Sequence, residues 1–223
     1  MARSKIEMSR RTATRAARRQ QLIDATMKCI ARKGIGSTTL ADVAREAGLS
    51  QGIVNLHFRT KDNLLNETLK YLAGEYQTQF ESTLSKSGPA AAAKLLALVE
   101  LDFRPAICDR RKLAVWFAFW GEVQSVPTYR KICDELDKHY DQEMIRLCEI
   151  LIDEGMYEGL DAAVVCDALS AMTNGLWLSC LISPRTWSRQ QAREAVMSYL
   201  RGVFPGHYDQ QKRDNGEGSG DRA

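Results

Sequence analysis

The chain has 223 residues, of which 44% are hydrophobic and 26% charged, so it can form one large domain or two modest ones. No stretch approaches about 18 uncharged apolar residues, and no apolar run follows the basic N-terminal residues. The sequence therefore predicts neither a transmembrane helix nor a signal peptide, and we expect a cytoplasmic protein with no membrane partner.

The six cysteines are scattered along the chain without a C-x-x-C pair, which argues against a zinc site and a thioredoxin motif. We expect most of them to be small buried hydrophobic residues, and no metal ligand set is predicted. A redox-sensing role for one of them stays open, because it depends on exposure and thiol pKa.

The charge is unevenly distributed along the chain, whose formal net charge is +3. Residues 1–61 hold 13 Lys and Arg against 4 Asp and Glu, a net +9, whereas residues 62–223 hold 18 against 24, a net −6. An asymmetry of this size indicates that the first segment binds a polyanion and that the larger segment has a different function. Nucleic acid is the leading candidate partner of the basic segment.

Apolar residues recur at spacings of three and four between Gly, Pro and Ser clusters, and no alternating strand pattern occurs. The pattern predicts an all-α fold of about nine helices. Their expected ranges are 14–33, 39–47, 50–58, 60–84, 89–104, 109–120, 127–155, 161–182 and 188–203. We expect a flexible basic arm over 1–14, a first domain over 15–61, a second over 62–204 and a disordered tail over 205–223.

Residues 39–58 meet the requirements of a helix-turn-helix, the core of an N-terminal three-helix DNA-binding domain. Thr39 and Asp42 have the form of a capping box at the start of one short helix. Gly48 permits a left-handed turn, after which Ser50 can cap a second short helix. The C-terminal remainder is expected to be a separate helical bundle.

The candidate DNA contacts gather in and around this segment. Gln51 and Asn55 lie four residues apart on one helix face, where amide side chains can read base edges in the major groove, and Gly52 permits close backbone approach. The other candidates are phosphate or minor-groove contacts: Arg15, Arg18, Arg19, Thr38, Thr39, Ser50, His57, Arg59 and Lys61. The competing interpretation makes the amides and arginines solvated surface residues and His57 a packed or merely exposed histidine.

These residues carry a family resemblance. The stretch Thr39-Leu-x-x-Val43-Ala44-x-x-Ala47-Gly48-Leu-Ser50-x-Gly52-Ile-Val-x-x-x-Phe58-x-x-Lys61-x-x-Leu64-Leu65 resembles the DNA-binding domain of the TetR family of bacterial repressors. The resemblance implies a homodimer, a recognition helix at about residues 50–58 and a C-terminal domain that binds a small-molecule inducer. The family commonly has an aromatic residue where this chain has Asn55, so Asn55 must read or position DNA differently.

The resemblance continues into the C-terminal part of the chain. The segments over residues 18–26, 50–54, 116–120, 127–130 and 174–178, among them Trp116-Phe-Ala-Phe-Trp120 and Asn174-Gly-Leu-Trp177-Leu, are similar to the BetI branch of that family. Repressors of this branch control choline-to-glycine-betaine genes. The branch implies a response to choline or a related quaternary ammonium compound, although it also includes regulators of other ligands. We expect no enzyme activity and no cofactor besides the small-molecule inducer.

A quaternary ammonium cation donates no hydrogen bonds and is best held by aromatic faces, with a carboxylate nearby. Trp116 and Trp120 lie four apart on one helix face, and Trp177 lies on another apolar helix. The candidate ligand-binding residues are Trp116, Phe119, Trp120, Tyr129 and Trp177, with Glu122, Asp102 and Asp167 as the acids. The alternative is that this aromatic stripe is ordinary core.

We expect homodimerisation through the last two helices, because their apolar surfaces exceed what one bundle face needs, and a palindromic double-stranded operator. The residues of these surfaces are Val164, Val165, Leu169, Met172, Leu176 and Leu200. Within the same class, the effector could be a different hydrophobic or cationic compound, as in efflux control. A helical enzyme is disfavoured because His57, His139 and His207 are far apart and no glycine-rich phosphate loop occurs. A non-specific, chromatin-like DNA binder, whose affinity falls with salt but does not depend on sequence, is the third alternative. For a repressor we expect association with the nucleoid when it is bound to DNA.

Overall fold

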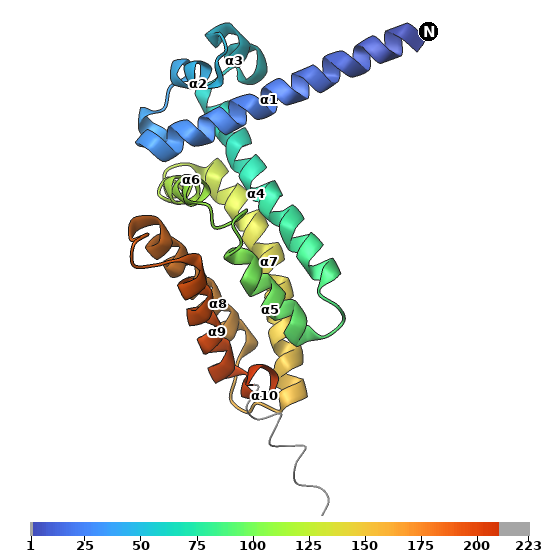
Figure 1. The fold of residues 1–223 in the computed structure, drawn as a ribbon, viewed down its shortest axis with the longest axis vertical. Helices are drawn as coiled ribbons and strands as arrows, with labels where there is room; N and C mark the ends of the chain where they lie inside the picture. Colours follow the sequence, from blue (N-terminus) through green and yellow to red (C-terminus); the bar gives the residue numbers. More distant parts are fainter. Residues whose placement is uncertain (1, 210–223) are drawn as a thin grey trace, which may run out of the picture. The chain divides into compact units, whose positions relative to one another are not determined.

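A computed structural model describes residues 2–209, with side chains from Thr14 onward. Over this range the chain is all-α, as expected, and contains ten helices (Figure 1). They are α1 (Ala2–Ser37), α2 (Leu40–Ala47), α3 (Gln51–Phe58), α4 (Lys61–Lys86), α5 (Ala91–Asp102), α6 (Arg110–Trp120), α7 (Pro127–Gly155), α8 (Ala162–Ile182), α9 (Arg189–Val203) and α10 (Pro205–Tyr208).

The helices form two compact units, and the division does not fall at the expected residue 61. The first unit holds residues 1–75 and 111–133, and the second holds 76–110 and 134–223. Helix α4 therefore contributes its first half to one unit and its second half to the other. The hydrophobic face of this helix continues across the division, which is why its sequence pattern gave no boundary.

In the first unit α1 packs against α2, and α2 packs against α3. The apolar side of α1 is buried through residues such as Leu22, Ile23 and Ile30. The helix path breaks at Gly34, whose φ of 80° is readily adopted only by glycine. Gly48 takes the left-handed conformation at the end of α2, with φ 64° and ψ 32°, and this turn directs α3 away from α2.

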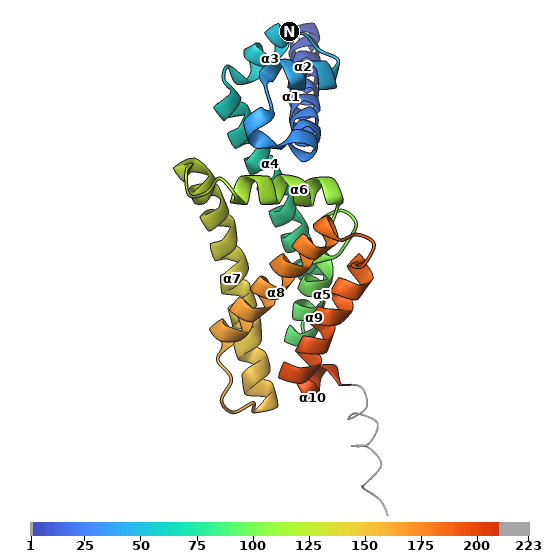
Figure 2. The same ribbon diagram turned by 90° about the vertical axis from the view of Figure 1, so that its left-hand side faces the viewer.

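The second unit is a bundle built from α5, α8, α9, α10 and parts of α4 and α7. Helices α8 and α9 run alongside each other, and α10 contacts α9 (Figure 2). The side chain of Asp161 accepts hydrogen bonds from the backbone N–H groups of Ala163 and Val164, which fixes the start of α8. Ser188 and Gln191 form a capping box at the start of α9.

Both chain ends differ from the expectation. Helix α1 begins at Ala2 rather than at Thr14, because residues 2–13 contain neither Gly nor Pro and are rich in helix-forming residues. Near the other end, Pro205–Tyr208 forms α10 rather than part of a disordered tail. The Tyr208 hydroxyl donates a hydrogen bond of 2.8 Å to the Ala92 carbonyl oxygen, which ties this short helix to α5. The rest of the expected tail, residues 210–223, lies outside the described residues.

Helix α8 is long and apolar enough to span a membrane by length and composition alone, with a mean hydropathy of 1.3, although it contains the charged Asp167. The core helix of a soluble protein meets the same criterion. Leu169, Thr173, Leu176 and Trp177 of α8 are buried inside the second unit.

Candidate functional site

The solvent-facing side of α3 carries the residues expected to read DNA. Gln51, Gly52 and Asn55 are exposed, whereas Val54 and Phe58 on the opposite side are fully buried in the first unit. Leu56 is also exposed, with 76% of its surface accessible. A short helix with amides, a glycine and one apolar side chain on its free face has the composition of a major-groove reader, since an apolar group can contact a thymine methyl.

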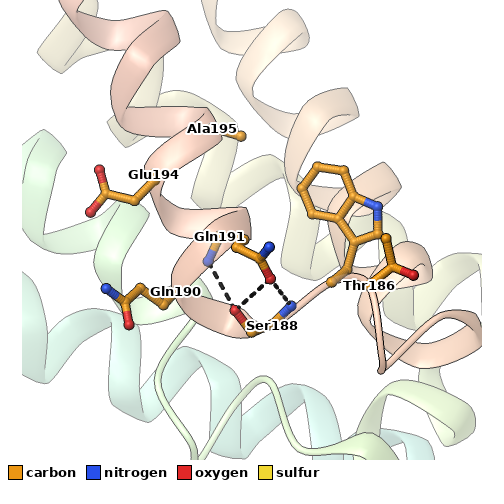
Figure 3. Close-up of a pocket in the computed structure, with 7 residues that line it drawn as sticks. Thr186, Ser188, Gln190, Gln191, Glu194 and Ala195 are labelled. Atoms are coloured by element: carbon orange, nitrogen blue, oxygen red, sulfur yellow. Dashed lines mark hydrogen bonds between the residues drawn. The ribbon is translucent and has the colours of Figure 1, made fainter.

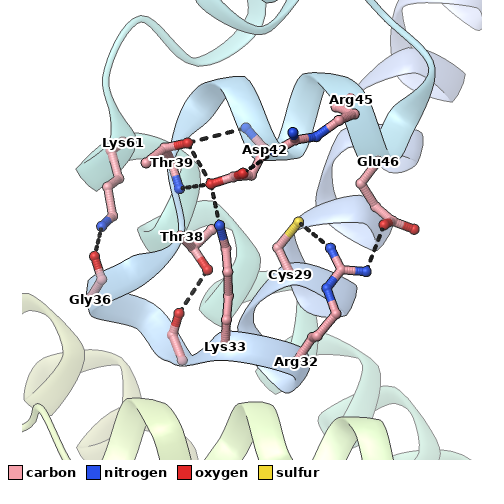
Figure 4. A network of polar contacts seen from close by, with 11 residues as sticks. Cys29, Arg32, Lys33, Gly36, Thr38, Thr39, Asp42, Arg45, Glu46 and Lys61 are labelled. Atoms are coloured by element: carbon pink, nitrogen blue, oxygen red, sulfur yellow. Dashed lines mark hydrogen bonds and ion pairs between the residues drawn. The ribbon is translucent and has the colours of Figure 1, made fainter.

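A polar network holds α2 and the turn before it in place (Figure 4). The Thr39 hydroxyl accepts from the Asp42 N–H at 3.2 Å, and the Asp42 carboxylate accepts from the Thr39 N–H at 3.0 Å, which completes the expected capping box. Lys33 of α1 pairs with the same carboxylate. The hydrogen bonds from Lys33 and Thr39 hold the pKa of Asp42 well below its usual range.

Three of the expected DNA contacts, Thr38, Lys61 and Arg19, are engaged within the first unit. Thr38 is buried, and its hydroxyl donates to the Gly34 carbonyl oxygen at 2.7 Å, so the expectation of a phosphate contact by this side chain is wrong. Lys61 donates to the Gly36 carbonyl oxygen at 3.0 Å (Figure 4).

Arg19 pairs with Glu67 of α4, and its guanidinium lies 5.3 Å from the centre of the Phe58 ring. It therefore joins α1, α3 and α4, while 41% of its side chain stays exposed. Burial, with the positive charges of Arg15 and Arg19, lowers the pKa of His57, which disfavours the charged form of this ring.

The remaining candidates stay at the surface. Arg15, Arg18, Thr39, Ser50 and Arg59 are exposed. Ser50 occupies the N-cap position of α3 with an extended backbone, but its side chain makes no capping hydrogen bond. Arg59 ends α3 with a φ of 60°, an uncommon value for a residue with a side chain, and this geometry turns the chain from α3 into α4.

A buried carboxyl group lies in the second unit. Asp102, at the end of α5, is 1% exposed, and the Tyr76 hydroxyl donates a 2.7 Å hydrogen bond to it. The Trp177 indole N–H of α8 donates to the Asp102 backbone carbonyl oxygen at 2.9 Å. Burial raises the pKa of Asp102 to about 7, and the hydrogen bond from Tyr76 opposes part of that rise.

Aromatic rings lie beside Tyr76, the hydrogen-bond donor to this carboxyl group. The Tyr76 ring lies 6.5 Å from the Trp177 ring in an edge-to-face arrangement and 6.3 Å from the Tyr140 ring of α7. Phe80 continues the group at 5.6 Å from Tyr140. We call Tyr76, Phe80, Asp102, Tyr140 and Trp177 the Asp102 cluster. Aromatic rings together with a carboxyl group are the residue types that bind a cation without N–H donors.

The structure divides the expected ligand-binding residues between the two units. Trp177 and Asp102 meet in the second unit, whereas Trp116, Phe119, Trp120 and Tyr129 lie in the first. There the Trp116 and Trp120 rings are 5.8 Å apart, and the Phe119 and Tyr129 rings are 4.9 Å apart.

The acids expected beside these aromatic residues are also divided. Glu122 is partly buried. Burial is the main cause that raises the pKa of Tyr129 to about 12, and the negative charges of Asp62 and Glu122 add to this rise. Asp167 is exposed on α8. Of the three acids, Asp102 is the one buried against aromatic rings.

Sequence reasoning did not single out Tyr76, Phe80, Tyr140 or Leu56. Tyr76 and Phe80 are one turn apart on α4, and their apolar spacing is the same as that of core residues. Only the position of Asp102 at the end of α5 reveals that Tyr76 has a polar partner. The exposure of Leu56 follows from the direction of α3, which its own pattern does not encode.

Helix α8 has a face that the second unit leaves uncovered. Val164 and Ile182 are 64% and 67% exposed, and Leu178 is also exposed. The exposed Ala171 and Gly175 lie on the same stripe at helical spacing. Of the apolar residues expected to face a partner, Val165, Leu169, Leu176 and Leu200 are instead buried in their own unit, because they pack the bundle core.

An open pocket of about 650 Å³ lies at the start of α9 (Figure 3). Its lining consists of Thr186, Trp187, Ser188, Gln190, Gln191, Glu194 and Ala195. The Glu194 carboxylate already pairs with Arg193 at 3.1 Å and Arg201 at 3.9 Å. The described residues contain no cluster of metal-ligating side chains.

Two family models match the chain. Residues 22–68 match the bacterial regulatory proteins of the TetR family, and residues 91–205 match the C-terminal domain of BetI-type transcriptional repressors. The second match alone spans more than half of the chain. This protein belongs to the TetR family and, within it, to the BetI-type repressors. Members of this family act by binding DNA rather than by catalysis, which confirms the expectation that the protein is not an enzyme.

Curated relatives agree with this assignment. The regulator BetI of Yersinia pestis is 29% identical over 198 residues, which cover 82% of this chain and 90% of that one. BetI of Pectobacterium carotovorum is 28% identical, covering 82% of this chain and 92% of the relative.

Solved structures share the fold. A transcriptional regulator from Pseudomonas aeruginosa superposes with a TM-score of 0.75 and 27% identity, covering 86% of this chain and 93% of that one. A regulator from Saccharomonospora viridis, solved in complex with choline, has a TM-score of 0.75 and 23% identity, covering 83% and 96%. TetR-family regulators bind DNA and small-molecule effectors and are generally dimeric.

Proposed function

We propose that this BetI-type repressor binds a palindromic operator as a homodimer and that a quaternary ammonium compound of the choline class is its effector. Its target genes would serve glycine betaine synthesis or uptake, and it would act in the cytoplasm, at the nucleoid when bound to DNA. The observation that carries the effector proposal is the buried Asp102 carboxyl group, which accepts a hydrogen bond from Tyr76, whose ring lies beside those of Tyr140 and Trp177.

The DNA contacts are assigned to the exposed face of α3. Gln51 and Asn55 would read base edges, and Leu56 would contact a thymine methyl group. Arg15, Arg18, Arg59, Thr39 and Ser50 remain exposed and would contact phosphates. Two copies of α3 in a symmetric dimer would recognise two half-sites, which requires a palindrome.

The dimer interface is assigned to the uncovered face of α8, with α9 beside it. Val164, Leu178 and Ile182 expose large apolar side chains there, and Ala171 and Gly175 would allow a second helix to approach closely. An apolar stripe of this kind is stabilised when a second copy removes it from water.

The effector assignment follows from charge. A quaternary ammonium ion near Asp102 favours the ionised carboxylate, whose negative charge is otherwise opposed by burial. The aromatic faces add roughly 0.5–2 kcal/mol each, depending on desolvation. The Asp102 cluster is favoured over the α9 pocket because Glu194 in that pocket already has arginine partners.

Helix α4 would transmit the signal. Tyr76 is the first α4 residue of the second unit, and Lys61 begins α4 in the first unit, shortly after α3 ends at Phe58. An effector that displaces the Tyr76 hydroxyl from Asp102 would therefore act on the helix that also supports the DNA-binding unit. By linkage, operator DNA must lower effector affinity by the same factor by which the effector lowers DNA affinity.

The test measures binding of a fluorescent duplex carrying the palindrome upstream of the gene, at fixed salt, while choline is added. We expect choline to weaken operator binding and its neutral tert-butyl analogue to have little effect. Asp102→Asn should abolish the response, while the control Asp167→Asn, at an exposed position on α8, should preserve it. An equal response to the neutral analogue would assign the protein to a hydrophobic effector instead, and equal binding to random DNA would make it a non-specific binder.

A further inference from the structure

Phe58 is the last residue of α3, and groups outside that helix hold both its ring and its carbonyl group. The side chain is 1% exposed, and the Arg19 guanidinium of α1 lies 5.3 Å from the centre of the ring. The Phe58 carbonyl oxygen accepts hydrogen bonds from the Thr60 N–H at 2.6 Å and from the side-chain amide of Asn63 at 2.9 Å. The end of α3 is therefore fixed from α1 and from α4.

Glu67 connects the contact on the Phe58 ring to α4. It lies one helical turn after Asn63 and pairs with Arg19, while Lys70 pairs with its other carboxylate oxygen at 3.3 Å. A guanidinium group can bind a carboxylate through its edge and an aromatic ring through its face at the same time, because it is planar. The Glu67 carboxylate thus holds the Arg19 side chain against Phe58.

We propose that Glu67 and Arg19 are positioning residues for operator recognition, which fix the orientation of α3 through Phe58 without reading DNA themselves. The inference rests on the proposed assignment of base contacts to α3. Hydrogen bonds to base edges require a defined pose of the reading helix, whereas contacts with phosphates carry no sequence information. A displaced α3 therefore loses operator affinity and keeps its affinity for random DNA.

The charge of Glu67 makes this proposal testable by the sign of an effect. Glu67 is negatively charged and belongs to the unit that binds DNA, a polyanion. On electrostatic grounds alone, removal of its charge strengthens binding to every DNA sequence. A positioning role predicts the opposite for the operator, because the Arg19 side chain loses the partner that holds it against Phe58.

Glu46 of α2 provides a matched control for the loss of charge. Its carboxylate pairs with Lys28 at 3.7 Å and with Arg32 at 3.1 Å, both on α1 (Figure 4). The Glu46 side chain is 22% exposed, against 24% for Glu67. Its ion pairs join α1 to α2, whereas the pair of Glu67 with Arg19 acts on α3.

The experiment measures binding of the full-length protein to the operator duplex and to a random duplex of equal length, by anisotropy at fixed salt. For Glu67→Gln we expect operator affinity to fall about tenfold, which is the size of an ion pair combined with a cation–π contact. Its affinity for random DNA should stay equal or rise. Glu46→Gln should change both affinities alike, so that their ratio keeps the parent value.

Arg19→Lys separates positioning from a phosphate contact. Lysine keeps the positive charge and can still neutralise a phosphate, but it lacks the planar group that binds carboxylate and ring together. We expect a lower ratio of operator to random affinity with an unchanged salt slope. The double variant with Glu67→Gln should lose no more than the single variants, because both changes remove the same contact. Full operator affinity in Arg19→Lys would make Arg19 a phosphate contact and overturn its positioning role.

Hydrogen exchange without DNA tests the orientation of α3 directly. Glu67→Gln and Arg19→Lys should speed amide exchange in residues 55–58 and leave α2 unchanged, which also shows that the unit remains folded. An unchanged ratio of operator to random affinity in Glu67→Gln would overturn the proposal, as would exchange in α3 at the parent rate. If Asn55→Ala leaves operator binding intact, the assignment of base reading to α3 fails, and the exchange rates still decide whether Glu67 and Arg19 hold this helix.

Discussion

Tyr76 of α4 donates a 2.7 Å hydrogen bond to the buried carboxyl group of Asp102 at the end of α5. The bond joins the helix that runs through both units to the segment that also receives the Trp177 indole N–H. Because burial raises the pKa of Asp102 to about 7, this carboxyl group gains or loses its proton when the pH changes near neutrality.

The first prediction concerns the pH dependence of stability. Asp102 has a folded pKa of about 7 against an ordinary value of 3.8, so the folded state binds more protons between these values than the unfolded state does. Its contribution to stability is therefore present below about pH 4 and is lost as the pH rises toward 7. Urea unfolding of Asp102→Asn should lack this decline, with a difference from the parent protein of a few kcal/mol at most across the range. Parallel pH profiles for the two proteins would contradict the assignment.

The second prediction separates the two tryptophan groups. Trp177→Phe keeps an aromatic face but removes the N–H donor to Asp102, so choline should bind at least about tenfold more weakly, which corresponds to roughly 1.4 kcal/mol. Trp116→Phe, in the first unit, is the matched control and should leave choline affinity unchanged. Calorimetric titration of both variants measures the difference, and the reverse order would move the effector to the Trp116 group.

The third prediction compares two N-cap residues. Thr39→Ala removes a complete capping box, so the first unit should lose about 1 kcal/mol of stability. Ser50→Ala is a close control, because the Ser50 side chain makes no capping hydrogen bond, and its stability should stay near that of the parent protein. Thermal unfolding followed by circular dichroism gives both values. Equal losses would show that the capping box contributes nothing specific.

The fourth prediction distinguishes base reading from phosphate contact. Asn55→Ala should weaken binding to the operator by about 1–3 kcal/mol and leave binding to random DNA nearly unchanged. Arg59→Ala should weaken both and reduce the slope of log affinity against log salt by about 0.9 for each phosphate that the arginine no longer neutralises. Anisotropy titrations at several salt concentrations test the pair, and a salt slope altered by Asn55→Ala alone would reverse the roles.

The fifth prediction concerns the dimer. Ile182→Lys introduces a charge into the uncovered face of α8 and should shift the protein to a monomer in sedimentation velocity. Met156→Lys is the matched control, since Met156 is 84% exposed but lies after α7, away from that stripe. A monomeric parent protein, or a dimer that survives Ile182→Lys, would exclude this face as the interface.

The sequence by itself determined the helical elements and the DNA-binding motif. The capping box of Thr39 and Asp42, the left-handed Gly48 and the full extent of α7 depend on local contacts within one or two turns, which the residue pattern encodes directly. The division of charge at residue 61 also indicated the DNA-binding segment from the sequence, because net charge depends on composition alone.

Only the tertiary structure decided which side chains have partners. Thr38, Arg19 and Lys61 matched a DNA-binding pattern, yet each is engaged by a residue distant in sequence or by a backbone carbonyl. Tyr76 and Asp102 are 26 positions apart, and no local pattern relates them. Helical periodicity specifies which face of a helix is apolar, but long-range packing decides which residues that face contacts. The proposed effector cluster depends on long-range packing alone.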